Sequence, residues 1–405
     1  PTSALLKLRE LQTQITDQKH PKIFPMLFLK NHYRLAHILA AITIILAFIP
    51  IIQSPLLLIG EISVLTFGSV CYLLFLFNNR TSDHRNLTAL LFYAVLLSLL
   101  DLYSGNTLNN TIQGTYRNIL YPVTSATIWF LCRLMRTKTI IFLIFSSLFA
   151  SSIYKVITVG APDSFEVLFK YYSGYYLVTL PFIALASRKT VKLITPILTF
   201  LFLFFITIGC RLNALETALS IILIVFFNAK DKSISLPFKI LIISGIFFST
   251  VLMISDVSLR DSASLEYSNR QRMEMNHYAI SKFLEKPLLG NGAYTYDDNY
   301  RDSQTRDTAK VVHSVFLLYT YEYGVLGAVF VLIIYYAYIK RCRLVYKLYQ
   351  NERIELTTLI ATCILMPKFL LAFLAMPIYG QIRLELAINY ALIMAFSSRP
   401  SILKK

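Results

Sequence analysis

Long apolar runs separated by short polar segments dominate the pattern along this chain. Runs of about 17 to 25 residues that are apolar on every side have the length of helices that cross a bilayer. The stretch ILTFLFLFFITIG at 197–209, within one such run, has apolar residues on every side. The pattern therefore predicts an all-α protein, a polytopic transmembrane helical bundle of about twelve spans. We expect these spans at 34–52, 55–78, 87–104, 119–134, 139–158, 173–187, 193–210, 212–228, 235–255, 313–338, 356–377 and 384–398.

Composition and charge placement agree with this prediction. The chain of 405 residues is 56% hydrophobic and only 15% charged, which excludes a water-soluble globule of this size. Its 39 Lys and Arg outnumber 22 Asp and Glu, a balance that also occurs in nucleic-acid-binding proteins. Here the basic residues gather in short loops on one side of the predicted bundle, as the positive-inside rule requires. We therefore expect a lipid bilayer as partner, no nucleic acid, and both termini in the cytoplasm.

One polar stretch is much longer than the other predicted loops. It covers 256–312 and divides the chain into an N-terminal transmembrane region (1–255), this outer loop, and a C-terminal transmembrane region (313–405). Long loops in compact proteins commonly carry function. The loop, predicted to face the periplasm, is therefore the first place to look for chemistry.

The loop is predicted to be partly helical. Apolar residues recur at near-helical spacing in RMEMNHYAISKFLEK (272–286), and the pattern stops at Pro287 and Gly290. This spacing indicates an amphipathic helix lying against the mouth of the bundle. The run that follows, GNGAYTYDDNYRDSQTRD (290–307), has no apolar period and is predicted to be irregular.

Several ionisable residues fall within or beside predicted spans, where a charge is costly and usually has a reason. Arg211 stands out because the link between its two spans is very short, which places the guanidinium at the outer mouth. A guanidinium there suits phosphate oxygens. An ion pair with Glu216 that only anchors the turn is the alternative. The ionisable residues within or beside predicted spans are Glu61, Lys155, Arg211, Glu216, Glu322, Lys368 and Glu385.

Three further residues could serve an anionic substrate or a hydroxyl. Arg270 and Arg272 stand near the start of the predicted amphipathic helix, where backbone amides also favour an anion. His313 stands at the water-facing start of an apolar span. An ordinary imidazole titrates near pH 6.5, so it can accept a proton from a hydroxyl near neutral pH. Exposed arginines and an interfacial histidine without function are the plainer alternatives.

Two motifs in this region resemble a known signature. EKPLLGNG (285–292) is followed by VVHSVFLLYTYEYGVLG (311–327), and Arg272 stands fifteen residues before Pro287. Together these segments resemble the carboxyl-terminal signature of the O-antigen ligase and Wzy-type polymerase superfamily of bacterial inner membranes. His313, Ser314, Gly324 and Gly327 fit the pattern of its ligase branch. Arg211, in GCRLNALETALS, resembles the upstream arginine of the family.

The resemblance implies a fold and a reaction. It implies a membrane-embedded glycosyltransferase similar to the GT-C class, in the bacterial inner membrane with its active site facing the periplasm. The donor would be an undecaprenyl-diphosphate-linked glycan and the acceptor lipid A-core. His313 would act as general base, while Arg211 and Arg272 balance the charge of the diphosphate. Arg270 and Ser314 would contact substrate. This inverting reaction requires neither a cofactor nor a metal.

Other readings of these residues remain open. Tyr294 and Tyr296 either present rings for sugar stacking or belong to an interfacial tyrosine belt. Asp297 and Asp298 form either a metal-binding pair or a solvated charge patch. Gly324 and Gly327 are expected to allow close packing of a neighbouring helix.

Two other functions also stay in view. A Wzy-type polymerase would use the same donor with a different acceptor. A transporter or flippase of lipid-linked sugar would instead place its functional charges near the bilayer midplane, on two related halves of the chain.

Overall fold

The computed structural model describes residues 66, 68–70, 82–134, 139–146, 149, 191–207, 211–227, 262–296, 299–300, 312–375 and 381–398. In this part of the chain every regular element is a helix, which agrees with the predicted all-α class. The labelled helices are α5 (Ser82–Tyr103), α6 (Leu108–Leu134), α10 (Val191–Thr207), α11 (Arg211–Phe227), α13 (Ser262–Glu285), α15 (Val315–Gln350), α16 (Leu356–Ala375) and α17 (Gln381–Ser397).

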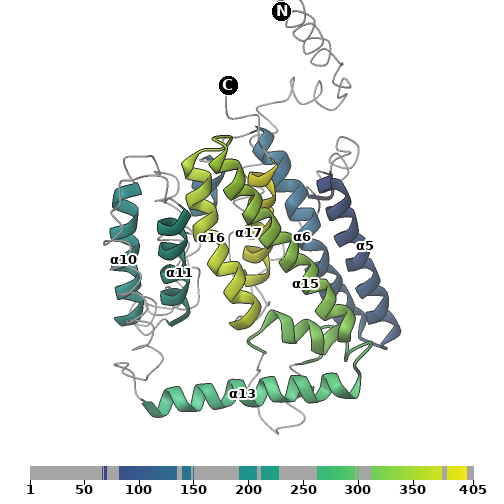
Figure 1. Cartoon of the computed structure of the whole chain (residues 1–405). Coiled ribbons are helices and arrows are strands. Elements are labelled where there is room, and N and C mark those ends of the chain that lie inside the picture. Colours follow the sequence, from purple (N-terminus) through teal and green to yellow (C-terminus); the bar gives the residue numbers. More distant parts are fainter. Residues whose placement is uncertain are drawn as a thin grey trace, which may run out of the picture.

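The helices form a bundle with one helix lying across its end. Figure 1 shows α13 at this end, roughly at right angles to the others. Within the bundle, α6 packs against α5 and α17, α15 against α16 and α17, and α11 against α10 and α16. The helix predicted at 272–286 is confirmed, although α13 begins ten residues earlier, at Ser262. It ends at Glu285, before Pro287, as expected for the residue type that cannot continue a helix.

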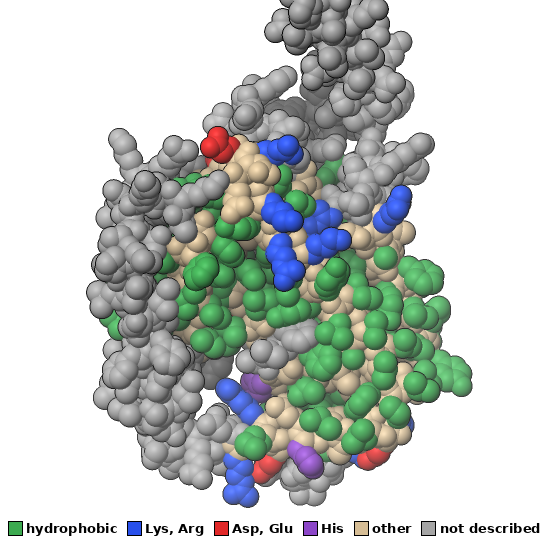
Figure 2. Space-filling model, in the orientation of Figure 1, with side chains coloured by type: hydrophobic (Ala, Val, Ile, Leu, Met, Phe, Trp, Pro, Cys, Tyr) green, Lys and Arg blue, Asp and Glu red, His purple; other side chains and the backbone are tan. Residues whose placement is uncertain are grey.

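The outer surface of the bundle is apolar. Phe92, Val95, Leu99 and Leu102 are exposed at helical spacing along α5. A soluble protein would expose such a stripe to water, whereas in a bilayer it faces lipid. Figure 2 shows hydrophobic side chains over the middle of the bundle and charged side chains towards its two ends.

Helix length and hydropathy also indicate a location in a membrane. Among the described residues, Arg85–Tyr103 and Val315–Gln350 are long and apolar enough to cross a membrane, and shorter apolar helices accompany them. The described part of the chain is therefore a helical membrane protein. The expected spans at 34–52, 55–78, 139–158, 173–187 and 235–255 lie wholly or mostly outside the described residues. The total of twelve thus stays a prediction.

Two predicted spans differ from the helices observed. The span expected at 119–134 begins at Leu108 instead, so Arg117 and Asn118 lie within α6 and not in a loop. The span expected at 313–338 is not one continuous helix, because Gly324 adopts φ 62° and ψ −148° within α15. Residues 315–323, here named the short helix, are thereby set off from the long part of α15 (Figure 1).

Candidate active site

The turn after α13 packs directly onto the break in α15. Because the helix is interrupted at Gly324, backbone groups near it are available to partners from elsewhere in the chain. The Val325 N–H donates to the carbonyl of Pro287 at 2.8 Å. In the other direction, the carbonyls of Tyr321 and Glu322 each accept a backbone N–H from the loop, at 2.9 Å. The two motifs that carry the family resemblance are therefore one packed unit.

Glycine is required on both sides of this contact. A Cβ at Gly290 would lie 2.3 Å from the carbonyl oxygen of Glu322, and one at Gly324 would lie 2.5 Å from that of Pro287. Both residues also have positive φ, at 72° and 62°. The sequence analysis predicted that Gly324 packs against a neighbouring helix, and this prediction names the wrong partner. Gly324 packs against a turn, whereas Gly327, in the long part of α15, packs against the carbonyl of Tyr319 in the short helix.

Ser314 starts the short helix. Its backbone is extended, and its hydroxyl accepts the N–H of Leu317 at 3.3 Å, as an N-cap does. The side chain is buried. Its observed contact is thus with the helix it caps, and a contact with substrate stays a prediction.

His313 lies immediately before this cap, and its side chain is half-buried. Burial lowers the pKa of the imidazole, and the positive charge of Arg272 lowers it further. α13, which carries Arg272, also packs against α15, which begins two residues after His313. A lower pKa favours the neutral imidazole, the form that can accept a proton.

Arg272 and Arg270 have different surroundings although both are exposed on α13. Arg270 Nε donates to Glu274 Oε1 at 3.3 Å, an i,i+4 pair within the helix. For Arg272, the described residues provide no carboxylate partner within ion-pair distance. Of the two, Arg272 is therefore better placed to receive an anion beside His313.

Arg211 is the first residue of α11, and its side chain lies outside the described part of the structure. Its predicted contact with a diphosphate stays a prediction. Glu216, the alternative partner considered for it, lies with Oε1 3.9 Å from Lys368 Nζ of α16. A buried cation from another helix thus already neighbours that carboxylate.

The tyrosines of the loop turn inward. Tyr296 has no exposed surface, and its hydroxyl donates to the carbonyl of Met275 at 2.9 Å. Its ring packs against those of Tyr278, Tyr300 and Tyr321. A ring enclosed in this way contacts no sugar in this arrangement, so neither sugar stacking nor an exposed belt describes Tyr296.

Tyr294 differs from Tyr296 in being only partly buried. Its ring centroid lies 5.0 Å from the guanidinium carbon of Arg117. Its backbone has φ 57° and its N–H donates to Glu322 Oε1 at 2.9 Å. Its contact with substrate stays a prediction.

A buried polar network lies behind this loop, and the sequence interpretation missed it. Arg117 of α6 forms an ion pair with Glu322, and both side chains have no exposed surface. The contact is forked: Arg117 Nη1 donates to Glu322 Oε1 at 3.3 Å, and Nη2 donates to Oε2. Asp101 of α5, also fully buried, accepts the hydroxyl of Tyr323 at 3.0 Å.

Of the residues in this network, the sequence analysis singled out only Glu322, as an ionisable residue within a predicted span. Helical spacing of small and polar residues in the first half of α6 could have revealed its partner. Thr111, Gly114, Arg117, Asn118 and Tyr121 lie three or four residues apart and are all buried. This spacing marks a polar helix face that needs partners inside the bundle.

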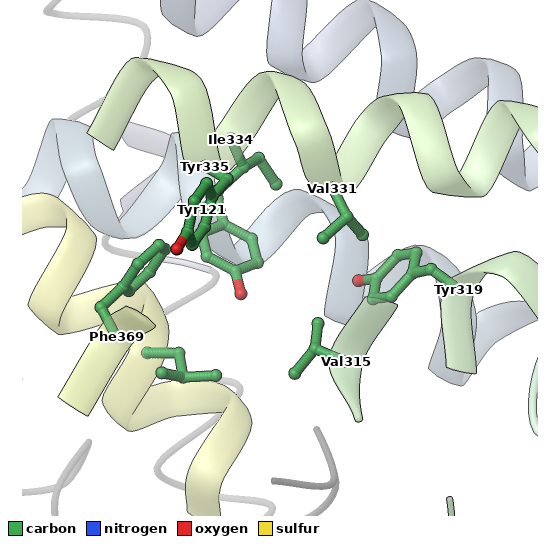
Figure 3. A pocket seen from close by; sticks show the side chains of 8 residues that line it. Tyr121, Val315, Tyr319, Val331, Ile334, Tyr335 and Phe369 are labelled. Carbon is green, nitrogen blue, oxygen red and sulfur yellow. The ribbon is translucent and has the colours of Figure 1, made fainter. Parts of the chain in front are cut away.

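An apolar pocket lies beside the short helix (Figure 3). Val315 and Tyr319 line it from the short helix, Tyr121 from α6, and Phe369 from α16. Its cavity volume is about 20 Å³, and part of it is open to the outside. Since Val315 follows His313 by two residues, the pocket is close to the histidine along the chain.

Metal ligands do not gather in the described part of the chain. No group of three or more His, Cys, Asp or Glu side chains there could hold an ion. Asp297 and Asp298, the alternative metal pair, lie outside the described residues. A metal-independent reaction therefore stays a prediction.

The fold and this site define a helical membrane protein with a partly helical segment closing one end of its bundle. Residues 177–332 match the family model described as O-antigen ligase, and this match supports assignment to that family. The matched segment contains Arg211, Arg272, His313 and the glycines of the break. Such a family implies a glycosyltransferase-like membrane enzyme of the bacterial envelope, acting in lipopolysaccharide assembly. No curated protein matches the chain.

Proposed function

We propose that this protein is an O-antigen ligase, transferring a glycan from undecaprenyl diphosphate to lipid A-core at the periplasmic face of the inner membrane. The observation that carries the proposal is that α13, with the exposed Arg272, packs against α15, whose start is preceded by the half-buried His313. A neutral base beside a cation is what transfer from a diphosphate carrier to a hydroxyl needs.

The orientation of the protein in the membrane is supported by positive charge at the end of the bundle opposite α13. Lys340, Arg343 and Lys347 are exposed along the last turns of α15, far along that helix from His313. Basic residues flanking a span favour the cytoplasmic side. The end that carries α13 and His313 would then face the periplasm, where a lipid-linked glycan and lipid A-core can meet.

The reaction proceeds in one displacement. His313 removes the proton of an acceptor sugar hydroxyl while the oxygen attacks the anomeric carbon of the donor. The bond between that carbon and the phosphate oxygen breaks, and its electron pair leaves with undecaprenyl diphosphate. Arg272 and Arg211 balance the negative charge that develops on the leaving group. The proton on His313 then passes to water, and the new glycosidic bond has inverted configuration.

The lipid parts of the substrates need an apolar environment next to these groups. The exposed apolar side chains of the bundle supply one, because the pocket lined by Val315, Tyr319 and Phe369 is too small for a hydrocarbon chain. The position of Arg272 and His313 at one end of the bundle also argues against a transporter, whose charges are expected at the membrane midplane.

Reconstitution of the purified protein in vesicles tests the proposal. Lipid-linked glycan is supplied alone or together with lipid A-core, and products are separated on a glycolipid gel. A ligase gives product only when core is present. Growth of the carrier-linked glycan without core would show a polymerase and would contradict the ligase assignment.

The role of His313 is tested in the same assay. His313→Ala should lower transfer by about 100-fold to 10,000-fold, the usual contribution of a general base. His277→Ala is the matched control, because His277 is an exposed histidine on α13 at the same end of the bundle. Equal activity of the two variants would overturn the base assignment.

A further inference from the structure

Residues 291–294 form a clasp, named here for four consecutive backbone N–H groups that all donate to buried acceptors. Asn291 donates to the carbonyl of Tyr321 and Gly292 to that of Glu322, each at 2.9 Å. Ala293 donates to Asp101 Oδ1 at 2.8 Å, and Tyr294 to Glu322 Oε1 at 2.9 Å. The clasp therefore joins the loop after α13 to both the short helix and α5.

The two carboxylates that hold the clasp are themselves held by the bundle. Glu322 is fixed by the fork of Arg117 from α6. Asp101 from α5 accepts the hydroxyl of Tyr323 at 3.0 Å. Tyrosine rings cover the guanidinium, with the Tyr319 centroid 4.5 Å from its carbon. Buried ionic groups with this many partners have one strongly preferred arrangement.

The short helix is tied to α6 at several points along its length. Besides Glu322 near its end, the Tyr319 hydroxyl donates to Asn118 Oδ1 at 2.9 Å. Asn118 Nδ2 in turn donates to the hydroxyl of Tyr323 at 3.1 Å. Since the helix is interrupted at Gly324, the position of the short helix depends on these ties and not only on the long part of α15.

We propose that Arg117, Glu322 and Asp101 are positioning residues for glycan transfer: they fix the short helix, and thereby the imidazole at its start, relative to Arg272. The inference rests on the proposed function, since it assigns these residues a role in the same site. All three side chains are fully buried. A displacement of about 1 Å by a change remote from the reacting atoms can lower a rate about 100-fold.

The decisive variant is Arg117→Met/Glu322→Leu. Removing both charges together leaves neither Arg117 nor Glu322 as a buried ion without its partner, so the protein is expected to fold. The control is Arg341→Met, which removes a buried arginine from the long part of α15, where Nη1 donates to Ser397 Oγ at 3.3 Å. Folded protein is quantified by size-exclusion chromatography and by its unfolding temperature, and rates are given per folded molecule.

The double variant should lower kcat about 100-fold and leave the KM for the lipid-linked donor nearly unchanged. The midpoint of the acidic limb of its pH–rate profile should move up towards the ordinary imidazole value, because His313 no longer keeps its place beside Arg272. A purely structural pair would change the amount of folded protein but neither kcat nor that midpoint. A folded double variant whose kcat and acidic midpoint equal those of the wild type would overturn the inference.

Arg117→Lys serves if the double variant does not fold. Lysine keeps the buried charge but loses the fork, so a smaller fall in kcat and the same direction of midpoint change are expected. A folded Arg117→Lys protein with wild-type kcat and midpoint would equally overturn the inference. His313→Ala is assayed alongside. If His313→Ala stays active, the proposed function fails; if it is inactive while the Arg117 variants behave as wild type, only the positioning role fails.

Discussion

Two polar regions meet at the α13 end of the bundle, and they differ in how their charges are paired. Arg117 and Glu322 have no exposed surface and form an ion pair with one another. Arg272 is exposed on α13 and acts on a half-buried His313. A charge that is buried and paired fixes geometry, whereas an exposed cation beside a neutral base can receive a substrate. Under the proposed mechanism, this difference separates groups that hold the site from groups that perform the reaction.

The largest expected effect concerns the buried region. Arg117→Met leaves the Glu322 carboxylate in the interior without its cation, which should lower the free energy of unfolding by about 3–5 kcal/mol. The unfolding temperature in detergent measures this loss. Adding Glu322→Leu should restore most of the stability because the unpaired charge is gone. A double variant no more stable than Arg117→Met would show that the pair is not the source of the effect.

In the exposed region the expected loss is one of rate. Arg272→Ala removes a cation that balances the leaving diphosphate, so transfer should fall about 100-fold to 1,000-fold with little change in stability. Arg343→Ala, an exposed arginine on α15, is the matched control and should transfer at the wild-type rate. Transfer by vesicle reconstitution and the unfolding temperature are measured on both proteins. A stability loss that accounts for the lost activity would place Arg272 with the buried region instead.

Gly324→Ala probes the connection between the two regions. Its φ of 62° and ψ of −148° belong to a region that only glycine occupies readily, so alanine should cost about 1–3 kcal/mol of stability. The new Cβ would also lie 2.5 Å from the Pro287 carbonyl and push the turn away from the break. Gly105→Ala is the control, because Gly105 has φ 75° but nothing within 4 Å of its Cβ position. Gly105→Ala should lose some stability through backbone strain but keep its transfer activity, whereas Gly324→Ala should lose more stability and also lose transfer. Equal losses would show that backbone strain alone matters.

Much of the helical framework was predictable, because a long apolar run has few alternatives in a membrane. Helices α5, α10, α11, α16 and α17 lie within a few residues of the expected spans. The first half of α6 was not predictable in the same way. Its sequence LNNTIQGTYRN is polar enough to suggest a loop, and it is helical because its polar face finds partners inside the bundle.

The site was predictable only in part. Arg272 and His313 could be proposed together from their motifs, since both stand in the matched signature. The pair of Arg117 with Glu322 could not, because 205 residues separate them and one sequence does not reveal which helices are neighbours. The break at Gly324 was missed for a related reason. A glycine in an apolar run is compatible with helix packing, and the turn at 287–290 that makes it necessary approaches only in the folded chain.

A smaller effect is expected in the pH dependence of transfer. The positive charge of Arg272 lowers the pKa of His313, together with burial. Activity that requires the neutral imidazole is present above that pKa and is lost as the pH falls through it. Arg272→Gln removes one of the two causes, so the acidic limb should move to higher pH and the residual activity should be lost sooner on acidification. An unchanged midpoint would mean that His313 does not control this limb.

The smallest expected effect is at Arg270, two residues from Arg272 on the same helix. Its exposed i,i+4 pair with Glu274 contributes about 0.3–0.5 kcal/mol, so Arg270→Ala should barely change the unfolding temperature. The sequence nevertheless marks Arg270 as a substrate contact. If it binds the glycan or its diphosphate, the KM for the donor should rise several-fold at constant kcat, since a contact made equally in the ground and transition states affects only binding. Substrate titrations of Arg270→Ala and Glu274→Ala separate the possibilities, because Glu274→Ala frees the guanidinium and should lower the KM. An unchanged KM in both variants would leave Arg272 as the cation of α13 that serves the substrate.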